Sequence, residues 1–240
     1  VRVVEKLAGI EVPERAMYLR VISAELQRIA SHLMATGFLL NDLGAFATPL
    51  MYCFRERERI LDLFEMLCGA RITLSYMRPG GVLQDAPEDF WPALDIFLND
   101  MPGYTDDLEA LITGNEIVMA RTRHIGILSA EEAISYGVTG PMLRATGVQW
   151  DLRKAAPYEV YDRVEFDIPI GAAGDTFDRY LVRIQEVRES IRIIRQCVMA
   201  LPEGPVKTPT PFNISPPAGD VYGSIDGPKG ELGFYLVSDE

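Results

Sequence analysis

The chain has 240 residues, of which 48% are hydrophobic and 24% charged, and its 35 acidic against 23 basic residues give a net charge of −12. This composition excludes a disordered or fibrous chain, and the acidic charge argues against a protein that wraps nucleic acid, because that requires a basic face. We expect one large domain, or a main domain with a small appendage. No apolar run reaches the ~18 residues of a membrane-spanning helix.

Helical periodicity dominates the first half of the chain. The stretch 14–40 has the 3-and-4 spacing of a one-sided helix, with apolar residues at Leu19, Ile22, Leu26, Ile29 and Leu33. Gly44 is available as a left-handed cap where this helix ends. A second helix is predicted over 50–68, closed by Gly69. Further helices are predicted over 87–99, 105–113 and 130–136.

The second half mixes loops, one long helix and strand patterns. Residues 138–150 are rich in Gly and predict turns, whereas the alternation over 164–168 predicts a short strand. A long amphipathic helix is predicted over 174–200, followed by a Pro-rich extended linker over 202–219 and a β-hairpin over 221–237. The predicted fold class is mainly α with a small β appendage. The chain thus divides into a helical core over 1–201, the linker 202–219 and a hairpin segment over 220–240.

The usual cofactor motifs are absent from the sequence. It contains no G-x-G-x-x-G after a strand, no G-x-x-x-x-G-K-[ST], no H-E-x-x-H and no G-x-S-x-G, which argues against direct nicotinamide binding by this chain. The cysteines Cys53, Cys68 and Cys197 form no C-x-x-C pair. Neither a disulfide framework nor a metal site made of cysteines alone is therefore expected.

Charged residues on the first helix form the clearest polar row. Glu25, Arg28 and His32 are seven and four residues apart, which places them near one face. They could be a buried ion pair beside a packed imidazole, or a polar row that enters a ligand pocket; spacing alone favours the first. Asp42 could likewise be a turn-forming residue or a carboxylate at the edge of a pocket. The charged residues of 150–154 are typical of internal ion pairs, which are usually structural.

Several stretches, taken together and in order, resemble one known family. They are 54–58 (Phe-Arg-Glu-Arg-Glu), 76–82 (Tyr-Met-Arg-Pro-Gly-Gly-Val), 140–145 (Gly-Pro-Met-Leu-Arg-Ala), 147–154 (Gly-Val-Gln-Trp-Asp-Leu-Arg-Lys), 174–180 (Gly-Asp-Thr-Phe-Asp-Arg-Tyr) and the region from 229 to 239. The chain is similar to the quinone-site core subunit of proton-pumping NADH:quinone oxidoreductase, respiratory complex I. The Trp-Asp-Leu-Arg-Lys block favours this quinone-reducing branch over the related hydrogenase large subunits.

The resemblance implies a hydrogenase-large-subunit-like helical fold and a place in the peripheral arm of that complex. Members of the family form the quinone (ubiquinone-type) headgroup pocket with a neighbouring iron–sulfur subunit, which carries the terminal [4Fe–4S] cluster. They bind no cofactor themselves, and quinone is the substrate. Electron transport from NADH is thereby coupled to proton translocation. The implied partners also include other peripheral-arm and membrane-arm subunits, and the implied location is peripheral on the cytoplasmic or matrix side of a membrane.

The resemblance also assigns residues. In the family, the Asp of a D-L-G-A element pairs with a histidine of an N-terminal loop, and that histidine contacts the quinone headgroup together with a tyrosine. Here the element begins at Asp42, which is the expected catalytic residue. We expect five further residues to line or brace the pocket, namely His32, Glu25, Arg28, Gly44 and Thr48.

Three departures and two alternatives accompany this interpretation. First, the family's histidine loop and tyrosine lie upstream of Val1 and its C-terminal segment lies beyond Glu240. Second, the turn after Ala45, over 46–49 (Phe-Ala-Thr-Pro), is one residue longer than in many relatives. Third, Thr73 occupies a position where many relatives have a histidine. The alternatives are a large subunit of a membrane-bound [NiFe] hydrogenase, which needs cysteine pairs near both chain ends, and a scaffold subunit that only organises its partners. The isolated fragment is expected to be inactive, because its electrons must come from a partner.

Overall fold

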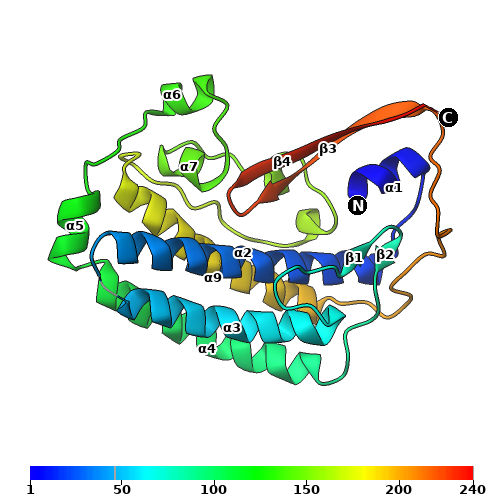
Figure 1. Ribbon diagram of the computed structural model, residues 1–240, viewed down its shortest axis with the longest axis horizontal. Coiled ribbons are helices and arrows are strands. Elements are labelled where there is room, and N and C mark those ends of the chain that lie inside the picture. The colour runs from blue at the N-terminus through cyan, green and yellow to red at the C-terminus, as the bar shows by residue number, and fades with distance from the viewer. Residues whose placement is uncertain (46, 240) are drawn as a thin grey trace.

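The computed structural model describes residues 1–45 and 47–239, and four long helices form its core (Figure 1). These helices are α2 (Glu14–Asp42), α3 (Thr48–Cys68), α4 (Phe90–Ile112) and α9 (Thr176–Met199). Helix α2 packs against α3 on one side and α9 on the other, and α4 closes the bundle by contacting both α3 and α9. The helical spacing over 14–40 and the helices predicted over 50–68 and 174–200 are confirmed.

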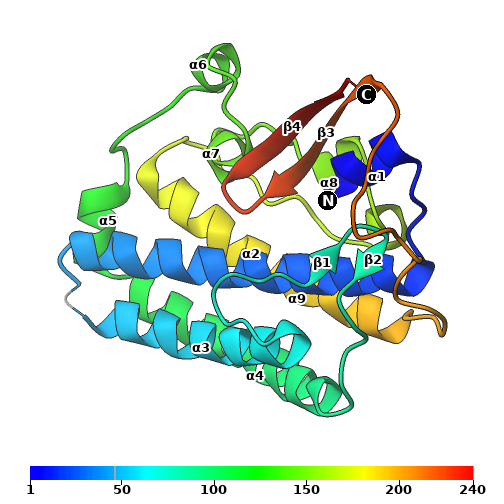
Figure 2. The same ribbon diagram turned by 45° about the vertical axis from the view of Figure 1, so that its right-hand side comes forward.

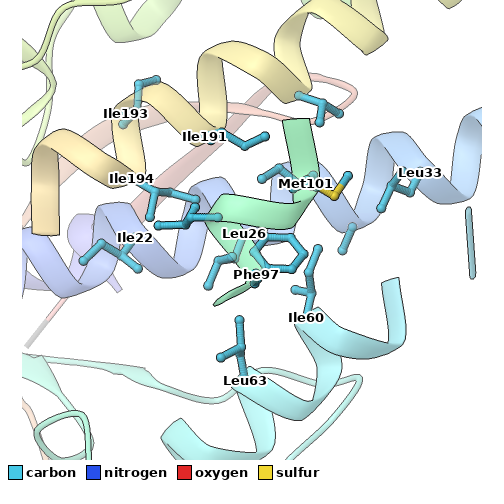
Figure 3. Close-up of a cluster of buried hydrophobic side chains, with 14 of the residues drawn as sticks. Ile22, Leu26, Leu33, Ile60, Leu63, Phe97, Met101, Ile191, Ile193 and Ile194 are labelled. Carbon is cyan, nitrogen blue, oxygen red and sulfur yellow. The ribbon is translucent and has the colours of Figure 1, made fainter. Parts of the chain in front are cut away.

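Apolar side chains from all four helices meet in the middle of the bundle (Figure 3). Leu26 on α2 and Phe97 on α4 are almost completely buried there, with Ile60 of α3 and Ile194 of α9 beside them. Burying a side chain of this size contributes about 1.5–3 kcal/mol, so the bundle rests on the apolar stripes that the sequence pattern predicts. No helix among residues 1–45 and 47–239 has the length and apolar character needed to cross a bilayer.

Helix α4 is continuous, so the prediction of two helices over 87–99 and 105–113 was wrong. Pro102 lies inside it and cannot donate to the carbonyl of Leu98 four residues earlier. The guanidinium of Arg195 on α9 donates to that carbonyl instead, at 2.8 Å. A tertiary contact thus compensates for the missing backbone hydrogen bond, which no local pattern shows.

Shorter elements surround the bundle: most lie on one side of it, and α5 lies at the C-terminal end of α2 (Figures 1 and 2). They are α1 (Arg2–Ala8), α5 (Glu116–Thr122), α6 (Ala130–Ser135), α7 (Gly140–Ala145), α8 (Leu152–Ala155), the 3₁₀ turn η1 (Tyr161–Arg163) and the two-residue strands β1 (Met77–Arg78) and β2 (Gly81–Val82). The helix predicted over 130–136 is α6, opened by the Ser129–Glu132 capping box. Sequence reasoning missed α1, α5, α7 and α8, because helices this short carry little periodicity.

The predicted hairpin is confirmed as β3 (Gly219–Gly227) and β4 (Gly230–Ser238), antiparallel with Gly227 opposite Gly230. Residue 240, the last of the predicted segment, lies outside the described residues. The tip of the hairpin packs directly on the start of α7. A Cβ added to Gly140 would come within 2.4 Å of the Cα of Gly230, so this contact requires glycine. The hairpin therefore contacts α7 through its tip, and it also packs on α1 and α8.

The short strand predicted over 164–168 was wrong. These residues run along α9 without strand pairing, and side chains of α9 satisfy their backbone: Gln196 bonds both the N–H and the carbonyl of Glu165, and Glu189 accepts from the N–H of Asp167. The alternation that suggested a strand reflects Val164 and Phe166, which face the core. In the Pro-rich segment, the structure has a single isolated bridge, between Lys207 and Gly81. The three-part division of the chain stays a prediction.

Candidate functional site

The turn that ends α2 is a tightly closed helix cap. The N–H of Ala45 donates to the carbonyl of Leu40 at 3.0 Å, and the N–H of Gly44 donates to the carbonyl of Asn41 at 3.1 Å. Gly44 has φ +92°, so it takes the left-handed position that the sequence predicted for it. These two bonds are those of a Schellman motif, which satisfies carbonyls at the helix end and fixes the direction of the following chain.

Asp42 is the last residue of α2, and its side chain is exposed at this turn. Within the described residues, its carboxylate accepts no hydrogen bond and forms no ion pair. The C-terminal end of a helix carries partial negative charge, so an acid placed here is mildly unfavourable for folding. The position of Asp42 therefore adds nothing to the stability of the described fold. This is expected of a carboxylate whose partner lies outside the chain.

Among the described residues, one basic side chain from another element contacts the turn. Arg121, on α5, donates from Nη1 to the carbonyl of Leu43 at 2.5 Å, and a Cβ added to Gly44 would lie 2.9 Å from the same nitrogen. Thr48, the first residue of α3, is exposed on the other side of the turn. Ala47 before it has φ +58°, an unusual conformation for a residue with a side chain. Asp42, Gly44 and Thr48 thus share one exposed corner of the molecule.

Two of the residues predicted on one face of α2, Glu25 and Arg28, lie away from this corner in a buried ring of charged side chains. The ring has six members of alternating sign, in the order Glu25, Arg28, Asp226, Arg144, Asp151 and Arg153. Their side chains come from α2, α7, α8 and its N-terminal cap, and the tip of β3. Each guanidinium contacts the acids on both sides of it, at distances from 2.6 to 3.5 Å. The ring therefore ties four parts of the chain together.

Two acids of the ring, Glu25 and Asp151, stay ionised despite burial. Loss of solvent alone would raise the pKa of Glu25, but Arg28 and Arg153, with hydrogen bonds from Ser190 and Tyr161, lower that pKa to about 2. Burial likewise opposes ionisation of Asp151, and Arg153 nevertheless lowers its pKa to about 2. The ring pairs three acidic side chains with three guanidiniums, so its acidic and basic groups are equal in number. Such a closed arrangement satisfies charges that would be very costly if left alone.

His32 lies next to the ring and is bound to it through Glu186. Its Nε2 is 2.6 Å from a carboxylate oxygen of Glu186, whose other oxygen accepts from Arg144 at 2.7 Å. Burial lowers the pKa of His32, and Glu186 only partly offsets that effect. The pKa of Glu186 is lowered in spite of burial, chiefly by the hydrogen bond from His32. Neutral His32 therefore donates to an ionised Glu186.

The structure thus separates the predicted site residues into two groups. Glu25, Arg28 and His32 do share a face, as the spacing predicted, and that face is buried in ion pairs. Ten residues separate His32 from Asp42, which is about 15 Å along a helix. Sequence reasoning anticipated internal ion pairs at 150–154 but missed Asp226, which lies 198 residues from its partner Arg28. The Asp-Gly turn of the hairpin was the one local signal at that position.

A cavity of about 470 Å³ lies under the hairpin, far along α2 from its C-terminal end. Its walls are mostly apolar and include Ile72 and Phe234, and Arg28 and Asp226 of the ring also line it. Asp42 is not among its lining residues. In the described part of the chain, no three His, Cys, Asp or Glu side chains gather as metal ligands.

The three cysteines are free, and two of them are deeply buried. Burial raises the pKa of the Cys53 thiol to about 11 and that of Cys197 to about 12. Both therefore remain protonated at neutral pH and pack as small apolar side chains.

Comparison with known proteins identifies the family. A family model described as the 49 kDa subunit of respiratory-chain NADH dehydrogenase matches residues 42–214. Over the whole chain, identity is 59% to the D-type subunit of NADH-quinone oxidoreductase from Dehalococcoides mccartyi strain 195, of which 65% is covered, and 55% to that from Clostridium beijerinckii, of which 64% is covered. The chain thus spans about two thirds of the length of these relatives. It belongs to the family of the 49 kDa subunit of respiratory-chain NADH dehydrogenase.

Proposed function

We propose that this chain is a core subunit of a proton-translocating NADH:quinone oxidoreductase and forms one wall of its quinone-reduction pocket, with Asp42 as the acid in that wall. The observation that carries the proposal is the exposed, unpartnered carboxylate of Asp42, within the described residues, on a turn closed by Gly44 and held by Arg121. Family membership and relatives named as a subunit of the same oxidoreductase support it.

The chemistry of quinone reduction gives Asp42 a defined role. Reduction to quinol takes up two electrons and two protons, and the protons must come from acids within hydrogen-bond reach of the quinone oxygens. A carboxylate that accepts a hydrogen bond from an imidazole fixes its tautomer and raises its basicity. Asp42 would hold such an imidazole, supplied from outside residues 1–240, and let it go once its proton has been donated. The electrons would come from an iron–sulfur cluster in a partner subunit.

The surface around the turn suits burial against a partner. Phe38 on α2 and Met51 and Tyr52 on α3 are 50%, 67% and 43% exposed. Apolar side chains gathered at one end of a molecule are typical of a contact surface. We assign this end of the molecule to the contact with the neighbouring iron–sulfur subunit. Contacts with the other peripheral-arm and membrane-arm subunits would hold the chain in a peripheral, membrane-associated position.

The test is a substitution in the assembled complex. Asp42→Asn keeps the shape of the side chain and removes its charge, so quinone reduction should fall by about 100-fold or more, the range of a lost acid–base group. Electron transfer from NADH to an artificial acceptor upstream of the quinone should be unchanged. The matched control is Asp107→Asn, which neutralises an exposed acid on α4 that has no polar contact among the described residues. Normal quinone turnover in Asp42→Asn would refute the assignment.

A further inference from the structure

We propose that Arg121 is a positioning residue for Asp42: it holds the end of α2 so that the Asp42 carboxylate meets its partners in one geometry. This inference rests on the proposed function, because it assigns a role within the same pocket wall. It concerns a residue 78 positions away from the turn along the chain, which neither motif nor spacing singles out.

The contact between Arg121 and the turn is close and specific. Nη1 donates to the carbonyl of Leu43 at 2.5 Å, and the open position above Gly44 lets the guanidinium approach, since a Cβ there would be 2.9 Å from Nη1. Among the described residues, Arg121 is the only one whose side chain donates a hydrogen bond to the backbone of 42–45. The glycine thus serves two needs, its positive φ and the approach of Arg121.

Helix α5, which carries Arg121, is itself held in place by a capping residue and by buried side chains. The side chain of Asn115 caps it by accepting from the N–H groups of Ile117 and Val118, at 3.0 and 3.2 Å. Val118 and Thr122 are buried, so α5 is fixed against the bundle while Arg121 extends from its exposed side. In Figure 1, α5 lies beside the C-terminal end of α2.

The contact also has a favourable electrostatic effect on the end of α2. The end of α2 carries the partial negative charge of the helix in addition to the Asp42 carboxylate, and a cation at that end is stabilising. An arginine also offers several N–H donors in a rigid plane, so one can bind the carbonyl while the others stay available to the solvent side. Without Arg121, the turn would keep its backbone bonds and the hydrogen bond from the N–H of Ala47 to the side chain of Asn41, but would lose the one described side chain that donates to residues 42–45.

Small displacements at a reacting group have large kinetic effects: a shift of about 1 Å can cost about 100-fold in rate. In the assembled complex, Arg121→Gln should therefore lower kcat for quinone by about 10–100-fold, with KM within about twofold and the upstream artificial-acceptor rate unchanged. Arg121→Lys, which keeps the charge and can donate one bond, should recover a large part of that loss. The control is Arg123→Gln, whose guanidinium packs over Phe177 instead of the turn.

A double variant separates this inference from the proposed function. If Arg121 acts through Asp42, Asp42→Asn combined with Arg121→Gln should be no slower than Asp42→Asn alone. Independent, multiplicative losses would overturn the inference, and so would a normal kcat in Arg121→Gln or a Lys variant no better than Gln. If Asp42→Asn is slow while Arg121→Gln is normal, only the inference fails. If quinone turnover is normal in Asp42→Asn, both the proposed function and the inference fail.

Discussion

Glu25 and Asp42 are two acids on the same helix in opposite surroundings. Glu25 is fully buried and accepts from Arg28, Arg153, Tyr161 and Ser190. Asp42 is exposed at the helix end and accepts from no described side chain or backbone group. The first acid has all of its hydrogen-bonding capacity used within the fold, and the second has all of it available. A carboxylate buried in a satisfied network positions the chain, whereas one exposed on a fixed turn can meet something outside it.

The ring around Glu25 explains how the parts of the fold are held in register. It joins the middle of α2 to the tip of the hairpin and to two short helices that have little apolar area of their own. Apolar contacts are not directional, but a guanidinium between two carboxylates allows few arrangements. The ring therefore favours one position of the hairpin tip and of α7 and α8, in agreement with the close Gly140–Gly230 contact.

The largest effect is expected from breaking this ring. Arg153→Met removes the guanidinium that binds both Glu25 and Asp151 and leaves two buried acids without that partner. The free energy of unfolding, measured with denaturant, should fall by about 3–5 kcal/mol. The control is Arg192→Met, which loses ion pairs at a side chain that is 47% exposed. It should change the free energy of unfolding by less than about 1 kcal/mol. Equal effects of the two would contradict the structural role of the ring.

Acid should weaken the buried region through His32. Burial lowers its pKa in the folded state, so below the usual value of 6.5 the unfolded chain takes up a proton that the folded chain does not. Stability should thus fall with decreasing pH, by at most about 1.4 kcal/mol per pH unit. His32→Gln, which can still donate to Glu186, should flatten the curve between pH 6.5 and 5. An identical slope in wild type and variant would show that His32 is charged in the fold.

Below that range, Glu25 and Asp151 of the ring dominate the pH dependence of stability. Their pKa values are lowered in the folded state, to about 2 for Glu25 and Asp151, so the stability they provide is present above pH 4.5 and is lost as the pH falls toward 2. Unfolding curves recorded at pH 4.5, 3.5 and 2.5 should show a steep second decline. A flat response over this interval would mean that these acids are not held as ions.

At the exposed turn, the backbone matters more than the charge. Gly44→Ala forces a side chain into φ +92° and against Arg121, which should cost about 1–2 kcal/mol of unfolding free energy. Gly114→Ala is the matched control, since an added Cβ meets nothing within 4 Å there. Denaturant unfolding of both variants tests this. A Gly44 variant as stable as the control would show that the turn is not constrained.

The smallest expected effect has the opposite sign. Asp42→Asn removes a negative charge from the C-terminal end of α2, so the chain should become slightly more stable, by about 0.3–1 kcal/mol. Thermal unfolding at low ionic strength, where such effects are least screened, is the measurement. A clear loss of stability would mean that Asp42 serves the fold and not an external partner.

The sequence was sufficient where the determinants are local. The 3-and-4 spacing located the helices, Gly44 marked the cap, and spacing placed Glu25, Arg28 and His32 on one face. Prediction from the sequence failed where a residue distant in the chain determines the local structure. Arg195 binds the carbonyl that Pro102 leaves free in α4, and side chains of α9 bind the backbone of 164–168 in place of the expected strand pairing. The ring could not be predicted, because its partners are far apart in the sequence: Glu25 and Arg153 are 128 positions apart, and Arg28 and Asp226 are 198.

The most direct test of the central claim is a map of the intact complex with a quinone-site inhibitor bound. Our account predicts the carboxylate of Asp42 on the surface of the pocket, linked to the bound headgroup through one imidazole or one water, with Arg121 still on the carbonyl of Leu43. A map in which Asp42 is covered by unrelated packing, remote from the inhibitor, would contradict it.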